Sequence, residues 1–142
     1  MLGRCFIELA AYMSVQSDQL KERAMSFAIM VLRLVDTLPQ TPSGQAIARQ
    51  LAKSATSVGA NYRASCNARS RAEFVAKLGI VVEESDEAEY WLSIIIKAQW
   101  LARVDLQPIH AEALELRAIF SKSLGTARTN LKMMKSNDKT TR

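Results

Sequence analysis

The chain has 142 residues, of which 49% are apolar, 23% charged and 6% aromatic, and its formal net charge is +5. This length suits a single domain with its own hydrophobic core. Five glycines and three prolines are too few for the many turns of a β-rich fold, so the composition predicts an all-α protein. Apolar runs all fall short of the roughly 18 residues that a membrane span needs.

The two cysteines, Cys5 and Cys66, match no metal-binding or redox spacing, so free thiols in a reducing compartment are expected. The opening residues lack the basic segment and continuous apolar run of a signal peptide. Together these observations predict a cytoplasmic protein.

Both ends of the chain are expected to lie outside the core. Residues 1–16 form an N-terminal extension, either disordered or a helical arm, and Met13 opens its more polar part. Residues 1–12 are interpreted as a start-site extension or a short arm. Residues 132–142 are polar and basic and are predicted to be disordered. The folded domain then covers residues 17–131.

The first predicted helix covers residues 18–38 and ends at Pro39, because proline disfavours helical backbone in the residue before it. Its apolar residues follow the 4-3 spacing of a bundle seam: Leu20, Ala24, Phe27, Val31, Leu34 and Leu38. The second helix covers residues 43–66. Its apolar face contains Ile47, Leu51, Val58 and Tyr62. Gly59 weakens that helix by about 1 kcal/mol relative to alanine, which indicates close packing against another helix.

The third helix covers residues 70–101 and opens with the S-x-x-E capping-box pattern at Ser70 and Glu73. Its core seam contains Phe74, Leu78, Val81, Ala88, Leu92 and Ile95. The fourth helix covers residues 105–131, with Asp105 as a suitable N-cap. Its seam contains Ile109, Ala113, Leu116, Phe120, Ala127 and Leu131. Short connections force antiparallel neighbours, so the fold is predicted to be an up-down-up-down four-helix bundle.

The third helix has a second apolar face that the core seam does not use. At about 100° per residue, Ile80, Trp91 and Ile94 share this face, with Glu87 at its edge. Four helices cannot easily surround one of their own members. These four residues are therefore predicted to form an interface between copies of the chain.

Polar residues also occur on faces that should be buried. Ser54 and Asn61 share the core-facing side of the second helix, and Glu84 lies at the border of the third-helix seam. A buried polar group without a partner costs about 1–3 kcal/mol. Ser54, Asn61 and Glu84 are therefore predicted to form a structural hydrogen-bond network.

No residue pattern indicates catalysis. His110, the only histidine, has no acidic or cysteine companion at a metal-binding spacing, and it is interpreted as a structural residue facing solvent or near a loop. The acidic residues between Glu83 and Glu89 spread around their helix, as on a solvated or salt-bridged surface. The sequence contains no phosphate-binding loop or nucleophile motif. We predict no catalytic residue, metal site or cofactor, and a protein that is not an enzyme.

Basic residues gather around the corner between the second and third helices. They are Arg49, Lys53, Arg63, Arg69, Arg71 and Lys77. The first interpretation is that they complement acidic segments of neighbouring helices or subunits. The second is a nucleic-acid surface that contacts the phosphate backbone, because aromatic residues that could stack on bases are not interleaved with them.

Residues 54–92, SATSVGANYRASCNARSRAEFVAKLGIVVEESDEAEYWL, resemble a bacterial four-helix-bundle family whose founding members are encoded by intervening sequences in 23S ribosomal RNA genes. The S-x-G-A-N element (Ser57 to Asn61), RAEF (Arg71 to Phe74) and the block from Glu84 to Trp91, which shows a local shift in spacing, carry the match. RAMSFAIMVLRLVDTLP in the first helix is similar too. The resemblance covers about residues 17–130.

This resemblance implies an antiparallel bundle that assembles into a ring-like homopentamer. One branch of the family is the accessory protein of diversity-generating retroelements, which is basic, pentameric and binds nucleic acid together with a reverse transcriptase. Two functions follow as expectations. The first is a non-enzymatic homo-oligomer that binds RNA or DNA. The second is a scaffold or adaptor whose main partner is another protein, such as a reverse transcriptase; neither involves a membrane.

Overall fold

The computed structural model describes the backbone of residues 2–140 and the side chains of residues 13–137. All regular structure in this part of the chain is helical: α1 (Leu2–Val35), α2 (Pro42–Cys66), α3 (Arg71–Lys97) and α4 (Gln107–Thr140). The prediction of a four-helix bundle is therefore confirmed.

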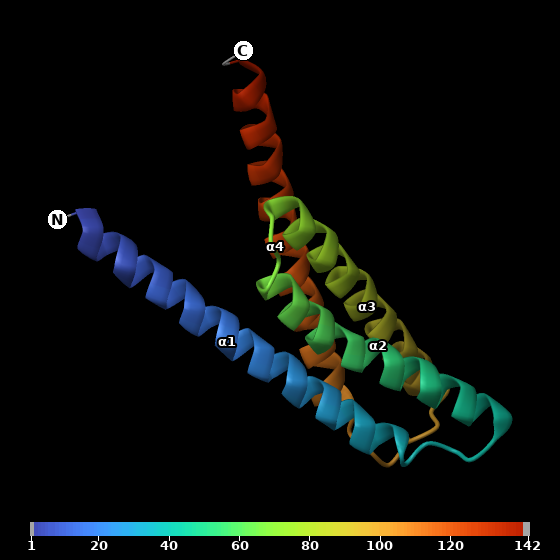
Figure 1. Ribbon diagram of the computed structural model, residues 1–142. Coiled ribbons are helices and arrows are strands. Elements are labelled where there is room, and N and C mark those ends of the chain that lie inside the picture. The colour runs from blue at the N-terminus through green and yellow to red at the C-terminus, as the bar shows by residue number, and fades with distance from the viewer. Residues whose placement is uncertain (1, 141–142) are drawn as a thin grey trace.

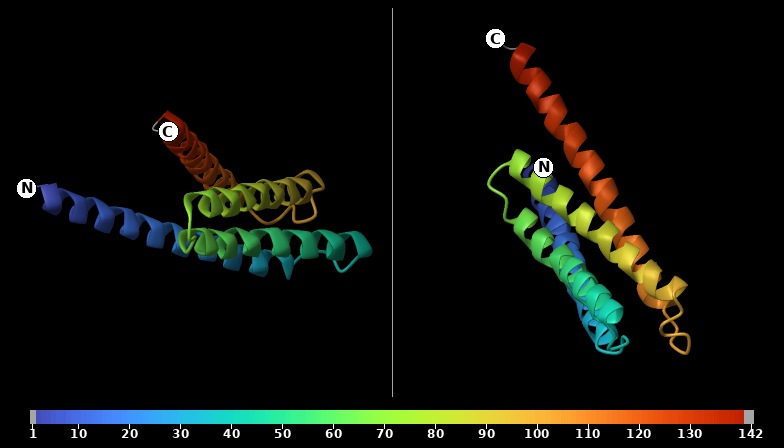
Figure 2. Two further views of the ribbon diagram at one scale, coloured as in Figure 1. Left: turned by 45° about the horizontal axis from the view of Figure 1, so that its top comes forward. Right: turned by 90° about the vertical axis from the view of Figure 1, so that its right-hand side faces the viewer.

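The helices pack in chain order, and the chain reverses direction in space at each connection (Figure 1). α1 packs against α2, α2 against α3, and α3 against α4, whereas α1 and α4 touch less extensively. The start of α1 and the end of α4 extend past α2 and α3 and diverge from each other, as the two further views confirm (Figure 2). The packed bundle therefore occupies the middle of the chain.

The core consists of the predicted seams. Fully buried residues come from every helix: Phe27 and Val31 from α1, Leu51 and Val58 from α2, Leu78, Leu92 and Ile95 from α3, and Leu116 and Phe120 from α4. The rings of Tyr62 and Phe120 pack at a centroid distance of 5.1 Å. Leu124, which lies one position off the predicted heptad, is also buried.

Local side chains fix the starts of α2 and α3. The hydroxyl of Thr41 accepts a hydrogen bond from the Gly44 amide (3.1 Å), which satisfies one of the free donors of the α2 N-terminus. At α3 the hydroxyl of Ser70 accepts from the Glu73 amide (3.1 Å), so the predicted capping pattern is present. The Glu73 carboxylate reaches back to the amide of Arg69 (2.8 Å).

The helix ends differ from those predicted. α3 ends at Lys97 and not at 101, because Gln99 adopts the left-handed conformation (φ 55°), which helical backbone cannot include. α4 starts at Gln107, whose amide donates to Asp105 (3.0 Å).

Both outer helices continue into the ends of the chain. α4 runs to Thr140, through residues expected to form a disordered tail, because neither proline nor glycine interrupts the sequence after Leu131. α1 includes residues 2–16 as a continuous helix.

Candidate interaction surfaces

The outer face of α2 carries a row of exposed basic side chains. Arg49, Lys53 and Arg63 project from this face, which lies opposite the buried Leu51, Val58 and Tyr62. Within the described part of the chain these three cations form no ion pair. We call Arg49, Lys53 and Arg63 the α2 basic row. Arg71, at the start of α3, is likewise exposed and without an ion pair there.

The other two predicted basic residues are partly neutralised. Arg69 Nε lies 3.4 Å from one carboxylate oxygen of Glu73, and Lys77 Nζ lies 3.8 Å from the other. The six predicted basic residues therefore fall into two groups. Arg69 and Lys77 are paired with Glu73, whereas the α2 basic row and Arg71 carry charges without an ion pair in the described chain.

The four residues predicted for the second face of α3 lie on one side of this helix. Ile80 is exposed, whereas Trp91 and Ile94 are half-buried at the edge of the bundle. The half-buried Glu87 accepts a hydrogen bond from the indole Nε1 of Trp91 (3.1 Å). We call Ile80, Glu87, Trp91 and Ile94 the α3 row. It leaves apolar surface in solvent within a single chain.

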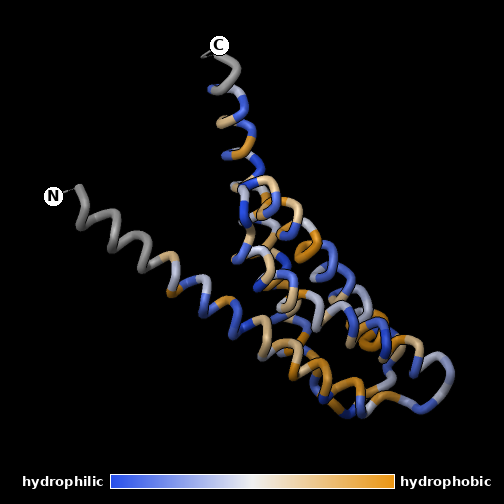
Figure 3. The backbone as a smooth tube through the Cα atoms, viewed as in Figure 1, coloured by the Kyte–Doolittle hydropathy of each residue, from blue (hydrophilic) through white to orange (hydrophobic). Residues whose placement is uncertain are grey.

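α1 carries a comparable apolar row that our sequence reasoning missed. Met25, Ile29 and Leu32 are all exposed and lie on the side of α1 away from the buried Ala24, Phe27 and Val31. Figure 3 shows how hydrophobic this second half of α1 is. We call Met25, Ile29 and Leu32 the α1 row. Their 4-3 spacing was visible in the sequence, but the stronger core seam of the same helix concealed it.

The predicted network between Ser54, Asn61 and Glu84 does not form. Ser54 donates to the backbone carbonyl of Gln50 (3.0 Å), and Asn61 donates to that of Ser57 (2.9 Å). Small polar side chains in a helix can satisfy themselves on the preceding turn and need no partner helix.

Glu84 is left with an unsatisfied group. Its Oε2 atom is buried and has no hydrogen-bond partner in the described chain. Burial raises the pKa of Glu84, and the neighbouring charge of Glu87 raises it further, while Lys53 opposes both effects. Burial without a donor therefore favours the protonated form of this carboxyl group.

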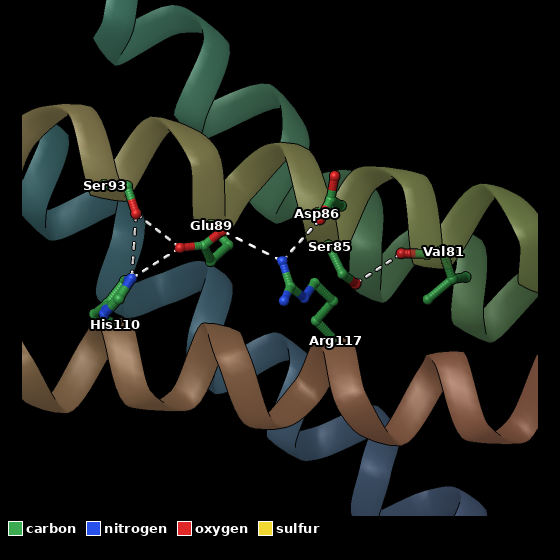
Figure 4. A network of polar contacts seen from close by, with 7 residues as sticks. All are labelled: Val81, Ser85, Asp86, Glu89, Ser93, His110 and Arg117. Carbon is green, nitrogen blue, oxygen red and sulfur yellow. Dashed lines mark hydrogen bonds and ion pairs between the residues drawn. The ribbon is translucent and has the colours of Figure 1, made fainter.

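A polar cluster that the sequence did not reveal joins α3 to α4 (Figure 4). Glu89 Oε1 lies 2.9 Å from His110 Nε2 and accepts from the hydroxyl of Ser93 (2.7 Å). Arg117 Nη1 lies 2.8 Å from Asp86 and 3.4 Å from Glu89. The hydrogen bond from Ser93 lowers the pKa of Glu89 most, and the one from His110 lowers it further.

His110 is therefore a half-buried residue in the α3–α4 interface. The expectation that it faces solvent is corrected, whereas its place in the first turn of α4 agrees with the expectation that it lies near a loop. The cluster contains serine, histidine and a carboxylate, but it lacks the arrangement of a catalytic triad. Ser93 (3.3 Å) and Glu89 both lie against the same nitrogen, Nε2, whereas a triad uses the two ring nitrogens separately. The geometry supports helix pairing.

A second polar contact joins α1 to α4. Arg23 Nε lies 2.6 Å from Glu112 Oε1, and its Nη2 lies 2.7 Å from Glu112 Oε2 and 2.7 Å from Glu115. These hydrogen bonds raise the pKa of Arg23, and the hydrogen bond to Glu112 has the larger effect. The contacts of α4 with α3 and with α1 thus both contain charge-assisted hydrogen bonds.

Two kinds of site are absent from the part of the chain that the structure describes. No three histidine, cysteine or acidic side chains there are grouped so that they could hold a metal ion. None of the helices in the same part has the length and apolarity to cross a membrane.

Comparison with known proteins identifies the family. Residues 16–122 match the model of the 23S rRNA-intervening sequence protein family. The chain belongs to this family, and the resemblance seen in the sequence is confirmed.

A solved structure has the same fold. It is a protein of unknown function from the S23 ribosomal protein family of Bacteroides thetaiotaomicron, with a TM-score of 0.69 and 28% sequence identity. The match covers 77% of this chain and 97% of that chain. None of the curated proteins compared with the chain matches it.

Proposed function

We propose that this protein is a non-enzymatic homo-oligomer that binds the phosphate backbone of RNA or DNA through the α2 basic row. The observation that carries the proposal is the alignment of Arg49, Lys53 and Arg63 on one exposed helix face without ion pairs in the described chain. Cations that are not already neutralised can replace the counterions condensed on nucleic acid, which favours binding at low salt.

The composition of this face favours backbone contact over sequence reading. Thr56 and Ala60 lie between the basic side chains, so the row has no aromatic ring on which a base could stack. One chain offers few charges, but each added copy repeats the row and strengthens its field. We take the number of copies to be five, as the family resemblance implies, and the compartment to be the reducing cytoplasm, where Cys66 stays a thiol.

The exposed α1 and α3 rows favour a second candidate function, in which the protein is an adaptor for another protein. Contiguous apolar surface outside a core marks protein contacts more often than nucleic-acid contacts. If both rows serve contacts between copies, they are not available to a different partner, so the oligomeric state also bears on this alternative.

A binding titration with duplex DNA and with structured RNA over a range of salt concentrations tests the proposal. The matched variants each neutralise three cations: Arg49→Gln/Lys53→Gln/Arg63→Gln on α2, and Lys122→Gln/Arg128→Gln/Lys132→Gln on α4, where these residues are also exposed. We expect the α2 variant to reduce the magnitude of the slope of log K against log salt on duplex DNA by up to about 2.7 for each copy that contacts the duplex, and the α4 variant to reduce it less.

Two results would contradict the proposed function. One is the absence of salt-sensitive binding by the unchanged protein at low ionic strength. The other is an equal loss in both variants, which would assign the binding to net charge alone. A stoichiometric protein partner that remains bound after nuclease treatment would favour the adaptor function.

A further inference from the structure

The two unused apolar rows lie on the outer faces of α1 and α3, the helices that flank α2. Ile29 is 43% exposed and Ile80 is 42% exposed, which is high for isoleucine in a packed bundle. Each row follows one side of its helix over two or more turns. Within the described chain the α1 row and Ile80 are exposed, whereas Trp91 and Ile94 are half-buried.

The charged residues beside the two rows differ in sign. On α1 the exposed Arg33 directly follows Leu32, one turn from Ile29, and forms no ion pair in the described chain, whereas Lys21 before the row is paired with Asp18 (3.0 Å). On α3 Glu84 and Glu87 lie between Ile80 and Trp91, and Lys77 before the row is paired with Glu73 (3.8 Å). The α1 row thus has an unpaired cation beside it, whereas the α3 row has two carboxylates that form no ion pair in the described chain.

This pattern disfavours pairing of two α3 rows. Such a pair would bring Glu84 and Glu87 of both copies together in a desolvated contact, where like charges repel strongly. Glu84 already has a buried oxygen without a partner, so a second carboxylate nearby would add to its cost. An α1 row supplies what the α3 row lacks, namely a guanidinium at Arg33.

We propose that the α1 row of one copy docks on the α3 row of a second copy, with Arg33 of one facing Glu87 of the other. The inference rests on the self-association in the proposed function and specifies the surfaces that produce it. Since the two faces differ, an open assembly keeps one unused α1 row at one end and one unused α3 row at the other. Such a head-to-tail contact continues until a ring closes or a filament grows.

This arrangement also agrees with the proposed nucleic-acid surface. The α2 basic row lies between the two docking rows on each copy, so docking covers α1 and α3 without using Arg49, Lys53 or Arg63. Every copy added to the assembly therefore contributes its basic row.

The test measures the solution mass of the full chain by light scattering at tens of micromolar. Ile29→Asp disables the α1 row and Ile80→Asp disables the α3 row. Leu114→Asp is the control, because Leu114 is similarly exposed (39%) but lies on α4, away from both rows. Far-ultraviolet circular dichroism checks that each variant keeps its helices.

We expect the unchanged protein and Leu114→Asp to be oligomers of equal mass, and each row variant alone to be a monomer. An equimolar mixture of Ile29→Asp and Ile80→Asp should form a dimer, because each supplies the row that the other lacks. Self-pairing of the α3 rows would instead leave Ile29→Asp dimeric alone, and self-pairing of the α1 rows would leave Ile80→Asp dimeric alone. Either result, or a mixture that stays monomeric, overturns the proposal.

Charge exchange provides a second test that does not insert a charge into an apolar contact. Arg33→Glu alone and Glu87→Arg alone should each raise the concentration at which half the protein is assembled by about tenfold or more, and the double variant should recover most of that loss. No recovery would contradict the Arg33–Glu87 pairing.

If the unchanged protein is an oligomer and neither row variant alters its mass, the docking surfaces are wrong while the proposed self-association stands. A monomeric unchanged protein would refute both.

Discussion

Glu89 on α3 and His110 on α4 approach to 2.9 Å and form the centre of the contact between these helices. Glu89 also accepts from Ser93 and lies 3.4 Å from Arg117, so one carboxylate connects three other side chains. Its side chain is only 16% exposed, which keeps these contacts largely out of water. The cluster fixes the register of α3 against α4, because the contacts of Glu89 with His110 and Arg117 depend on positions along both helices.

The first prediction concerns the pH dependence of this cluster. The folded state lowers the pKa of Glu89 below its ordinary value of 4.5, so the ionised carboxylate stabilises the fold fully above that value. This contribution is lost as pH falls through the lower folded pKa. Glu89→Gln should cost about 1–2 kcal/mol in the free energy of unfolding at pH 7, and the difference from the unchanged protein should shrink below pH 4.

Urea unfolding at several pH values measures this difference. Glu83→Gln is the control, because Glu83 is exposed and forms no ion pair in the described chain. It should change stability little at any of these pH values. A Glu89→Gln deficit that is constant from pH 7 to pH 3 would show that the ionised form of Glu89 is not what stabilises the contact.

The second prediction concerns the contact between α1 and α4, where Arg23 bridges Glu112 and Glu115. Arg23→Met keeps the aliphatic bulk of the side chain but leaves Glu112, which is 19% exposed, without its cation. The expected cost is about 1–2 kcal/mol in unfolding free energy. Hydrogen exchange should also accelerate in the middle of α1, since α1 and α4 share few other contacts.

Arg103→Met is the control for this variant, because Arg103 is exposed in the connection before α4 and has no ion pair in the described chain. Equal exchange rates in α1 for the two variants would mean that the Arg23 bridge does not hold α1 in place.

The sequence predicted the features that depend on a single helix. Hydrophobic spacing located the core residues of all four helices, and the capping pattern located Ser70 at the start of α3. The α3–α4 cluster was missed because it depends on which turn of one helix faces which turn of the other. Asp86, Glu89 and Ser93 do share one side of α3, and His110 and Arg117 share one side of α4. Only the register between the helices shows that these sides meet.

Two other differences between the sequence predictions and the structure have a similar origin. Ser54 and Asn61 were assigned partners on another helix, but the carbonyl of the preceding turn is closer and is always available. The early end of α3 depends on the left-handed conformation of Gln99, a residue type with no marked preference for it. Neither outcome follows from spacing or composition.

The third prediction concerns the start of α3. Ser70→Ala removes the hydroxyl that accepts from the Glu73 amide, and such caps contribute about 1 kcal/mol. Thermal unfolding should show this loss. Ser123→Ala is the matched control, because Ser123 is also exposed but bonds only to the carbonyl of Ile119 in its own helix, and its replacement should be nearly neutral. If the two variants unfold at the same temperature, the cap does not contribute to stability.

The fourth prediction compares two buried glycines of α2. A methyl group added at Gly59 would lie 3.6 Å from the Cβ of Ala24 on α1, an ordinary van der Waals distance. The helices therefore pack closely at this position, as the sequence indicated, but leave room for a methyl group. Gly59→Ala should raise the free energy of unfolding by up to about 1 kcal/mol, because alanine favours helical backbone.

A methyl group at Gly44 would instead overlap the carbonyl oxygen of Pro39, a backbone atom that cannot move without displacing the turn after α1. Gly44→Ala should therefore destabilise the protein in the same urea titration, and equal signs for the two variants would contradict this packing of α1 on α2.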